Sequence, residues 1–495
     1  MRAMNKLALW VVAGCVFLSI SSIARAQDTA DLDKVMAEVL KPSPVETNLQ
    51  QLTDRVGGRV PGTPAMQKAI EWGVAAFKAA GADSVHTEEF KLPAAWSEGT
   101  TKASVIEPEQ FSVRAVSLAW APPLASQHRV RIVDAGQGTS ADFARAGNIE
   151  GALVFIHSDE MKKWDDLFAE YLKAPAIVDQ AVKGKALAIA FQSTRPNDLL
   201  YRHTNSINGE VDRIPMVLVA REDGSRIARL IASGQALYAD LSIPNQVGGP
   251  ITASNVIGEI KGSEKPDEVV LLGAHLDSWD LGTGALDNGC NAALVIDALR
   301  AIKASGVRPR RTIRFALFAG EEQGMMGSRA YAVAHRAELD KVAGVVIFDS
   351  GIGKVTGFSV GGRKDVVSAV TPLVAPLKQF GAATLTTDAE WGTDNFDFML
   401  EGVPTFVANQ EEANYLINYH ASSDTFDKVD IPTLKKHVAE AAELTLALAD
   451  TPQPVGPRLH HQEIEQTFRD THLDDQLKTF GIWQDWESGK RGRKD

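Results

Sequence analysis

The stretch EVVLLGAHLDSWDLGTGALDNG, Glu268–Gly289, is the part of the sequence that most constrains the fold. Residues 269–274 form an apolar run with the length of a buried strand. The run leads directly into a loop that holds a histidine, several aspartates and several glycines. Such a loop is typical either of a solvent-exposed turn or of a site that holds a positively charged group.

The sequence around this stretch alternates strand-like and helix-like segments from Ser254 to Asp450. Segments with apolar residues at helical spacing separate four apolar runs, at 269–274, 312–319, 342–348 and 403–408. Repeated alternation of this kind predicts right-handed crossovers between parallel strands. We therefore expect an α/β fold, with a mixed, largely parallel sheet and helices on both of its faces.

The region between 118 and 248 has a different pattern. Short β-like runs such as RVRIV, ALVFI and IPMVLV are separated by turn residues, and long helical patterns are few. We interpret this region as a mostly β domain inserted into the main domain. The expected organisation is a discontinuous main domain at 27–117 and 249–450, an inserted domain at 118–248, and a linker with a C-terminal extension at 451–495.

The first 26 residues have the features of a secretory signal peptide. Arg2 and Lys6 precede an apolar segment, and Ala24–Ala26 has the small residues of a cleavage site. A lipoprotein processing site at Cys15 is the less favoured alternative, because the chain stays apolar after it. We expect export to the periplasm or the extracellular space, and no membrane span.

Composition limits the partners and the redox chemistry. The signal segment carries three basic residues, so its removal changes the formal net charge from −12 to −15, and such a surface repels nucleic acids and anionic lipids. Cys290 is then the one remaining cysteine, which excludes an internal disulfide. The sequence leaves the oligomeric state, monomer or homodimer, open.

Acids and histidines follow the predicted strands of the main domain. In parallel sheets, functional groups collect beyond the carboxyl ends of the strands. The residues concerned, including two from loops, are His275, Asp277, Asp287, Glu321, Glu322, Asp349 and His420. So many carboxylates cannot all stay ionised side by side without cations. Imidazole and carboxylate ligands suit zinc, and two ions that share a bridging carboxylate would neutralise the site.

Each residue also has an ordinary structural interpretation. Asp287 would serve as a helix cap, and Glu321 with Glu322 as a solvated helix start. All of these separate structural roles would have to hold at once, at successive strand ends of one sheet. A shared metal site is the simpler explanation. Asp287 is the best bridging ligand because it begins a helix beside the carboxyl ends of the strands. Asp277 lies where it can orient the imidazole of His275.

Several motifs resemble the co-catalytic zinc exopeptidases of the M28 clan. They are RVGGRVPGTP, GAHLDSWDLGTGALDNG, ALFAGEEQG, FDSGIG, GTDNFDF and YHASSDT. The resemblance covers most of the chain between the signal peptide and Pro452. It implies a zinc exopeptidase fold and an inserted domain similar to a protease-associated domain. By position it also implies two zinc ions, one held by His275 and Asp349, the other by Glu322 and His420, with Asp287 between them.

The same resemblance implies the chemistry. Glu321 would act as the general base. The zinc ions, together with the hydroxyl of Tyr419, would stabilise the tetrahedral oxyanion. The chain departs from the family pattern at Asn395, where many members have a histidine, and at Tyr419, where some members have another residue and others a tyrosine. The expected activity is hydrolysis of dipeptides, or of N-terminal residues of short peptides.

Other classes of function compete with this interpretation. The pattern GFSVG, Gly357–Gly361, matches the nucleophile elbow of serine hydrolases, with Ser359 as the nucleophile. That enzyme would leave His275, Asp287 and the paired glutamates without a role. A second alternative is a non-catalytic binding protein on the same fold, and a third is a zinc-dependent cyclase or amidase.

Overall fold

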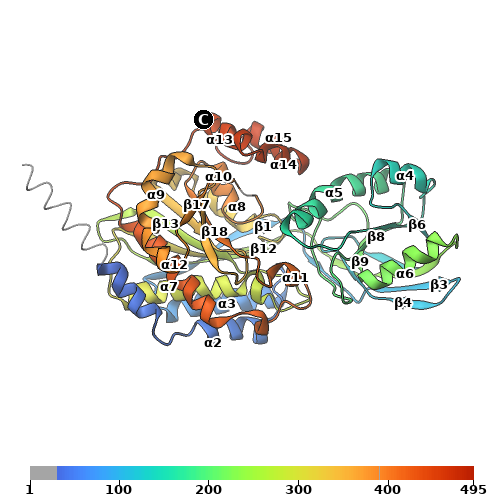
Figure 1. The fold of residues 1–495 in the computed structure, drawn as a ribbon, viewed down its shortest axis with the longest axis horizontal. Coiled ribbons are helices and arrows are strands. Elements are labelled where there is room, and N and C mark those ends of the chain that lie inside the picture. The colour runs from blue at the N-terminus through green and yellow to red at the C-terminus, as the bar shows by residue number, and fades with distance from the viewer. Residues whose placement is uncertain (1–29, 390) are drawn as a thin grey trace, which may run out of the picture.

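The computed structural model describes residues 30–389 and 391–495. Within them the chain forms two eight-stranded sheets, each with its own helices, and the part with the second sheet projects from the part with the first (Figure 1). The predicted signal peptide and Cys15 lie outside the described residues.

The first sheet is mixed, with a parallel centre. Its strands are β1 (Ser84–Leu92), β12 (Ile251–Ile260), β13 (Lys265–His275), β14 (Arg311–Phe318), β15 (Val342–Ile347), β16 (Val355–Ser359), β17 (Thr384–Thr386) and β18 (Thr405–Gln410). They lie in the order β1-β12-β14-β13-β15-β18-β16-β17. The four central strands from β14 to β18 are parallel to one another, whereas β12 and β16 run antiparallel to them. The mixed, largely parallel sheet that the sequence predicts is confirmed.

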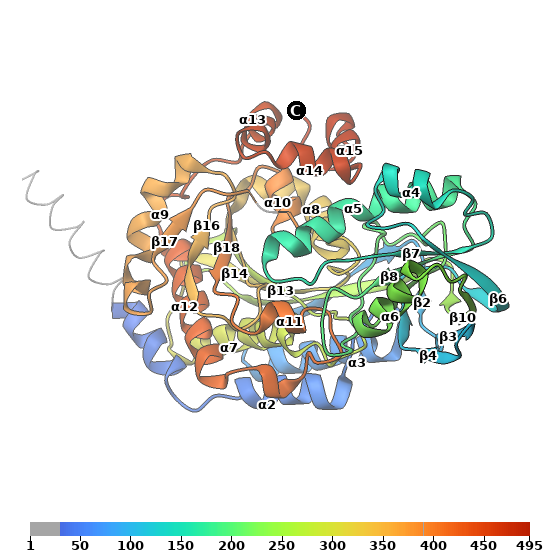
Figure 2. The same ribbon diagram turned by 45° about the vertical axis from the view of Figure 1, so that its right-hand side comes forward.

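Helices cover both faces of this sheet (Figure 2). One face carries α2 (Val45–Gln50), α3 (Pro64–Ala79), α7 (Cys290–Ala304), α9 (Val367–Val374) and α12 (Ile431–Asp450); the other carries α8 (Met326–Ala334) and α10 (Phe396–Leu400). Val270 and Leu272 of β13 enter the first core, and Val269 and Leu271 enter the second. Because β13 is buried on both faces, its sequence is a continuous apolar run and does not alternate with polar residues.

The second sheet has the order β4-β3-β10-β6-β7-β8-β9-β5. Its strands are β3 (Lys102–Glu107), β4 (Phe111–Val113), β5 (Ala115–Ser117), β6 (Leu124–Asp134), β7 (Leu153–Ile156), β8 (Ala188–Gln192), β9 (Met216–Val219) and β10 (Tyr238–Ile243). Strands β6 to β9 are parallel. Its helices are α4 (Ser140–Ala146), α5 (Trp164–Lys183) and α6 (Arg221–Ala232), and β2 (Trp96–Ser97) pairs separately with β11 (Gln246–Val247).

This region differs from the sequence-based expectation in two ways. It is not mostly β, because α5 alone has 20 residues; Pro175 interrupts the helical pattern in the sequence, although the helix continues through it. Strands β3 to β5 also belong to the second sheet, so this sheet begins before the expected boundary at residue 118. Strands this short carry too little pattern to indicate which sheet they join.

The C-terminal segment packs against the first sheet's helical layer formed by α8 and α10. It contains α13 (His461–Asp470), α14 (Leu473–Thr479) and α15 (Ile482–Ser488). Phe468 and Trp486 pack with Phe396 of α10 in one apolar cluster. Arg491 forms a buried, two-pronged ion pair with Asp397, with N–O distances of 2.8 and 2.6 Å. Helix α14 also contacts α5 of the second sheet, so the segment touches both parts of the molecule.

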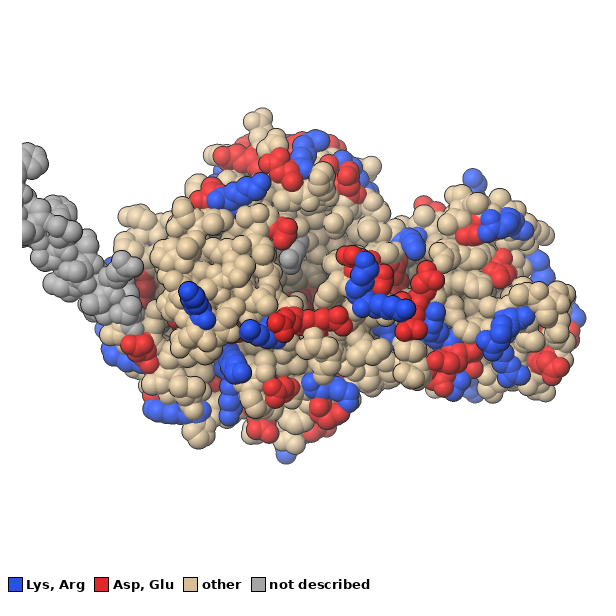
Figure 3. Space-filling model, in the orientation of Figure 1, with Lys and Arg blue, Asp and Glu red and all other residues tan. Residues whose placement is uncertain are grey.

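Among residues 30–389 and 391–495, none of the helices combines the length and the apolar character that a bilayer crossing requires. Figure 3 shows Lys and Arg interspersed with Asp and Glu over one face, which therefore presents no continuous basic surface. Cys290 is a buried free thiol in α7.

The stability of the fold should depend on pH through Glu440 of α12. This side chain is 2% exposed, and its Oε2 has no hydrogen-bond partner among the described residues. Burial raises the pKa of Glu440 from 4.5 to about 8. Between those values the unfolded chain releases this proton before the folded chain does, so the free energy of unfolding falls as pH rises. We expect Glu440→Gln to be more stable than wild type by about 1–3 kcal/mol at pH 8.

Urea unfolding at pH 4.5 and pH 8 measures this effect. The gain from Glu440→Gln should nearly vanish at the lower pH, because the carboxyl there is protonated in the folded state and half protonated in the unfolded state, so its ionisation changes the free energy of unfolding little. Glu109→Gln, at an exposed position, should leave the free energy of unfolding unchanged at both pH values. An equal gain at both pH values would show that Glu440 does not titrate as its burial indicates.

Candidate metal centre

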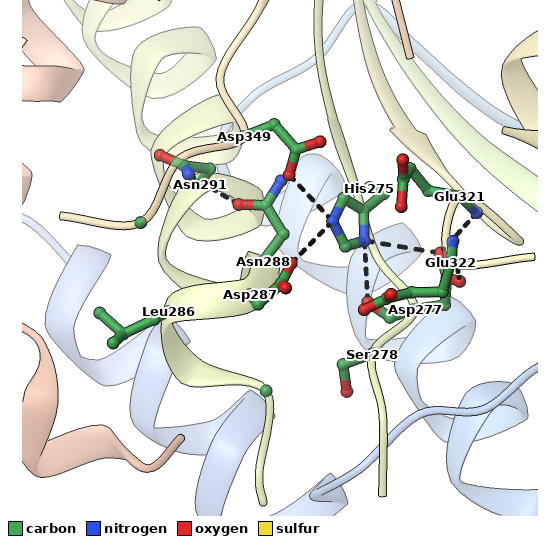
Figure 4. Close-up of polar contacts among 12 residues, drawn as sticks. His275, Asp277, Ser278, Leu286, Asp287, Asn288, Asn291, Glu321, Glu322 and Asp349 are labelled. Atoms are coloured by element: carbon green, nitrogen blue, oxygen red, sulfur yellow. Dashed lines mark hydrogen bonds and ion pairs between the residues drawn. The ribbon is translucent and has the colours of Figure 1, made fainter. Parts of the chain in front are cut away.

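Three neighbouring strands of the first sheet bring predicted site residues to one edge (Figure 4). His275 ends β13, Glu321 and Glu322 follow β14, and Asp349 follows β15. Because these strands are parallel and adjacent, their carboxyl ends lie together. The loop before α7 adds Asp287 to the same edge.

The acids and histidines form two groups that share Asp287. In the first group, His275 Nε2 lies 3.1 Å from Asp287 Oδ1 and 3.0 Å from Asp349 Oδ1. In the second, His420 Nε2 lies 3.3 Å from Asp287 Oδ2 and 2.9 Å from Glu322 Oε2. Asp287 thus presents one oxygen to each group, as a bridging carboxylate would.

The donor atoms of both groups fit a bound cation. In each group, three such atoms lie within 4.8 Å of one another. Asp287 Oδ2 and Glu322 Oε1 are buried without a hydrogen-bond partner among the described residues, an unfavourable state that a cation would relieve. A cavity of about 10 Å³ is lined by Asp287, Glu322, His420 and Trp279, which is room for one water-sized occupant. Each group could therefore hold one divalent ion.

Burial and neighbouring charges set the protonation of these side chains. Burial raises the pKa of Glu322 to about 7 and shifts the pKa of Asp349 upward. Burial lowers the pKa of His420, but Glu322 and Asp287 outweigh it and bring the pKa to about 9. Burial opposes ionisation of Asp287 as well, yet the hydrogen bond from His275 and the nearby positive charge of His420 give it a lowered pKa. The imidazoles bind protons that compete with a metal for the same nitrogens, so metal binding would release protons.

Asp277 connects the first group to the paired glutamates. Its backbone carbonyl accepts a hydrogen bond from His275 Nδ1 at 3.0 Å, and its carboxylate lies 3.6 Å from the same nitrogen. The carboxylate also accepts hydrogen bonds from the N–H groups of Glu321 and Glu322, at 3.2 and 3.3 Å. The sequence predicts the contact with the imidazole, and the structure adds a second role in orienting the Glu321–Glu322 turn.

Glu321 lies beside the metal-ligand candidates but belongs to neither group. Its side chain is largely buried. Burial raises the pKa of Glu321 well above the ordinary range; attraction to His275 opposes this, and repulsion by Asp349 and Glu322 adds to it. A carboxyl group with a raised pKa that is not committed to a ligand position is suited to proton transfer.

Tyr419 lies directly against one of the ligand candidates. Its ring stacks on that of His420 with centroids 3.6 Å apart. Its hydroxyl lies 3.3 Å from the hydroxyl of Tyr171 in α5. The structure therefore brings Tyr419 to the site, and its contact with a developing oxyanion stays a prediction.

Comparison with known proteins shows similarity to one peptidase family. Residues 255–445 match the model of Peptidase family M28. Carboxypeptidase Q from Mus musculus is 28% identical over 404 residues, which cover 81% of this chain and 84% of that protein. Leucine aminopeptidase 2 from Trichophyton equinum is 27% identical over 328 residues, 65% of this chain and 59% of that protein.

Solved M28 structures share the fold of this peptidase. A peptidase M28 precursor from Shewanella amazonensis matches with a TM-score of 0.79 at 27% identity, over 87% of this chain and 99% of that chain. A zinc aminopeptidase from Bacillus subtilis matches with a TM-score of 0.63 at 22% identity, over 82% and 93%. Family, relatives and fold identify the chain as a hydrolase of the metallo-exopeptidase class.

Asp424 holds the loop that carries Asp287, and sequence reasoning missed it. Its carboxylate accepts hydrogen bonds from three consecutive N–H groups, those of Ala285, Leu286 and Asp287, at 3.1, 2.7 and 3.1 Å. The bridging candidate is therefore fixed at its backbone by an acid 137 residues away. Asp424 lies within the motif YHASSDT, but nothing in that motif reveals which N–H groups it binds.

Arg59 performs the complementary task from the N-terminal part of the peptidase. This buried guanidinium donates to the carbonyls of Leu276, Thr283 and Gly284 at 2.6, 2.8 and 2.9 Å. Gly284 has a φ of 60°, and a Cβ there would lie 2.3 Å from the side chain of Ser278. Glycine is thus required for the tight turn of this loop. The motif RVGGRVPGTP contains Arg59 but does not show its partners.

Ser359 is in a structural environment. It is buried at the end of β16, its hydroxyl donates to the carbonyl of Asp388 at 2.7 Å, and it accepts from the N–H of Gly361 at 3.2 Å. These partners are backbone groups, whereas a serine nucleophile needs a histidine. The geometry of Ser359 does not support the serine-hydrolase alternative.

We expect Asp424→Asn to destabilise the loop of Asp287. The amide NH₂ would face a backbone N–H, so one buried hydrogen bond is lost and the folded state becomes less stable by about 1–3 kcal/mol. Zinc bound per chain after dialysis should fall as well, because Asp287 is no longer held. Asp427→Asn, at a nearby exposed position, is the control and should change neither quantity. An unchanged melting temperature and zinc content in Asp424→Asn would contradict the role given to Asp424.

Proposed function

We propose that this peptidase binds two zinc ions and hydrolyses dipeptides or N-terminal residues of short peptides. The observation that carries the proposal is Asp287, whose two oxygens face two groups, each completed by a histidine and an acid. His275 and Asp349 would hold one ion, and Glu322 and His420 the other. Mixed imidazole and carboxylate donors suit zinc, and the similar Bacillus subtilis structure is that of a zinc aminopeptidase.

The chain's own side chains have distinct tasks in this reaction. When bound, the ions supply Lewis acidity to the peptide carbonyl and to the attacking water. Glu321 accepts a proton from that water and later gives it to the leaving amine. The carboxylate of Asp277 accepts a hydrogen bond from the backbone N–H of Glu321 and so orients this residue. The backbone carbonyl of Asp277 holds His275 in one tautomer. The hydroxyl of Tyr419 stabilises negative charge on the carbonyl oxygen.

The proposed substrates carry a free α-ammonium group. Carboxypeptidase Q and leucine aminopeptidase 2 are among the relatives. The carboxylates at this edge of the first sheet would also attract the positively charged N-terminus of a peptide. We also propose that the region from β3 to β10, residues 102–243, is an inserted domain of the protease-associated type. The signal-like first 26 residues support export to the periplasm or the extracellular space.

We expect Glu321→Gln to bind zinc as wild type does but to turn over about 10²–10⁴ times more slowly. Glutamine has the same shape but cannot accept the proton of the attacking water. Steady-state kcat on a dipeptide and zinc per chain, measured on the same sample, check both parts. Glu322→Gln is the matched control at the next residue, and it should lose zinc as well as activity. Near-normal turnover by Glu321→Gln would remove Glu321 from the role of base.

Substrate profiling tests the proposed reaction itself. We expect hydrolysis of free dipeptides, little or no hydrolysis of the same dipeptides with a blocked N-terminus, and loss of activity on chelation that zinc restores. A serine-directed inhibitor should have no effect. Activity that survives exhaustive chelation would contradict the metal mechanism, and zinc-loaded protein without peptidase activity would favour a binding protein.

A further inference from the structure

The loop that carries His420 is paired with the region of the second sheet. Tyr201 and Ala421 form an isolated antiparallel bridge. On one side of the bridge, the N–H of Arg202 donates to the carbonyl of His420 at 2.9 Å. On its other side, the N–H of Ser422 donates to the carbonyl of Leu200 at 3.0 Å. A metal-ligand loop of the peptidase sheet thus forms a short ribbon with residues 200–202.

The backbone at His420 depends on this support. Its φ is 59°, in the left-handed region, which costs a residue other than glycine about 1–3 kcal/mol. Arg195 adds a contact, because its Nη2 donates to the carbonyl of Tyr419 at 3.4 Å. Arg195 is itself fully buried, lies 3.6 Å from a carboxylate oxygen of Glu170 and covers the ring of Tyr201. A rigid network behind the ribbon therefore holds the loop.

The imidazole of His420 is also held from the inserted side. Its Nε2 faces the acids, and the partner of its Nδ1 among the described residues is the hydroxyl of Tyr171, at 3.5 Å, which is longer than a typical hydrogen bond. In contrast, His275 Nδ1 binds the carbonyl of Asp277 in its own sheet. A hydrogen bond to the outer nitrogen orients a metal-binding histidine. The two proposed metal positions therefore differ in which part of the chain orients their histidine.

We propose that the inserted region is a structural part of one metal position. Tyr171 is a positioning residue that orients His420, and Arg195 and Arg202 fix the backbone that carries it. The insertion thereby sets the zinc affinity of the position formed by Asp287, Glu322 and His420, and leaves the position at His275 unaffected. This inference rests on the proposed function, because it needs two zinc positions.

The test is a zinc titration of metal-free full-length protein against a competing chelator. Tyr171→Phe removes one oxygen and keeps the ring. We expect it to lower the affinity for one zinc ion about 10–100-fold, the range found when such outer hydrogen bonds are removed, and to leave the other affinity unchanged. In a Glu322→Gln background, which already lacks a ligand at the same position, Tyr171→Phe should have no further effect.

Matched variants separate this role from a general loss of structure. Tyr331→Phe removes a buried hydroxyl that accepts a hydrogen bond from Arg314 at 2.8 Å and belongs to neither group of ligand candidates, so both affinities should stay as in wild type. Should Tyr171→Phe fold poorly, Arg195→Lys provides the second test, because Lys keeps the charge but loses the guanidinium that donates to the carbonyl of Tyr419. Arg195→Lys should weaken the same zinc ion and leave the other affinity unchanged.

Each other result counts against the inference. Equal weakening of both zinc ions, or no weakening of either, in Tyr171→Phe or in its substitute Arg195→Lys would overturn it and leave the proposed function intact. Wild-type protein that binds fewer than two zinc ions would overturn the proposed function first, and this inference with it.

Discussion

The burial of several carboxylates at one edge of the first sheet is the constraint on which the candidate metal centre depends. Asp287, Glu322 and Asp349 meet at one edge of a sheet with two histidines between them. Without positive charge such a cluster would take up protons, because burial, with a smaller contribution from Asp287, raises the pKa of Glu322. The fold brings these acids together at a cost in stability that a bound cation would offset.

The neighbouring structure keeps this cluster from relaxing. Asp424 fixes three consecutive N–H groups of the loop around Asp287, Arg59 fixes carbonyls of the same loop, and Asp277 fixes the Glu321–Glu322 turn. All of these holding residues are buried or nearly so. They let the ligand candidates keep their positions before any ion arrives, which is the preorganisation that a metal centre requires.

The sequence predicts the central sheet and the residues at its edge because both follow from local patterns. Apolar runs end at His275, Glu321 and Asp349, and parallel strands must bring such ends together. The holding residues leave no local trace, because Asp424 and Arg59 act through backbone groups far along the chain. The inserted region was harder to predict, since Pro175 masks a long helix and the strands before residue 118 are very short. The contact of Tyr171 with His420 joins two sheets, and no pattern within either one indicates it.

The ribbon between residues 200–202 and 420–422 also has an evolutionary consequence. The region of the second sheet supplies backbone partners to the loop of His420 and is not structurally independent of the peptidase sheet. A chimera that takes this region from another homologue would have to take the matching ligand loop as well. We expect substitutions in these two stretches, more than two hundred positions apart in the gene product, to depend on one another during evolution.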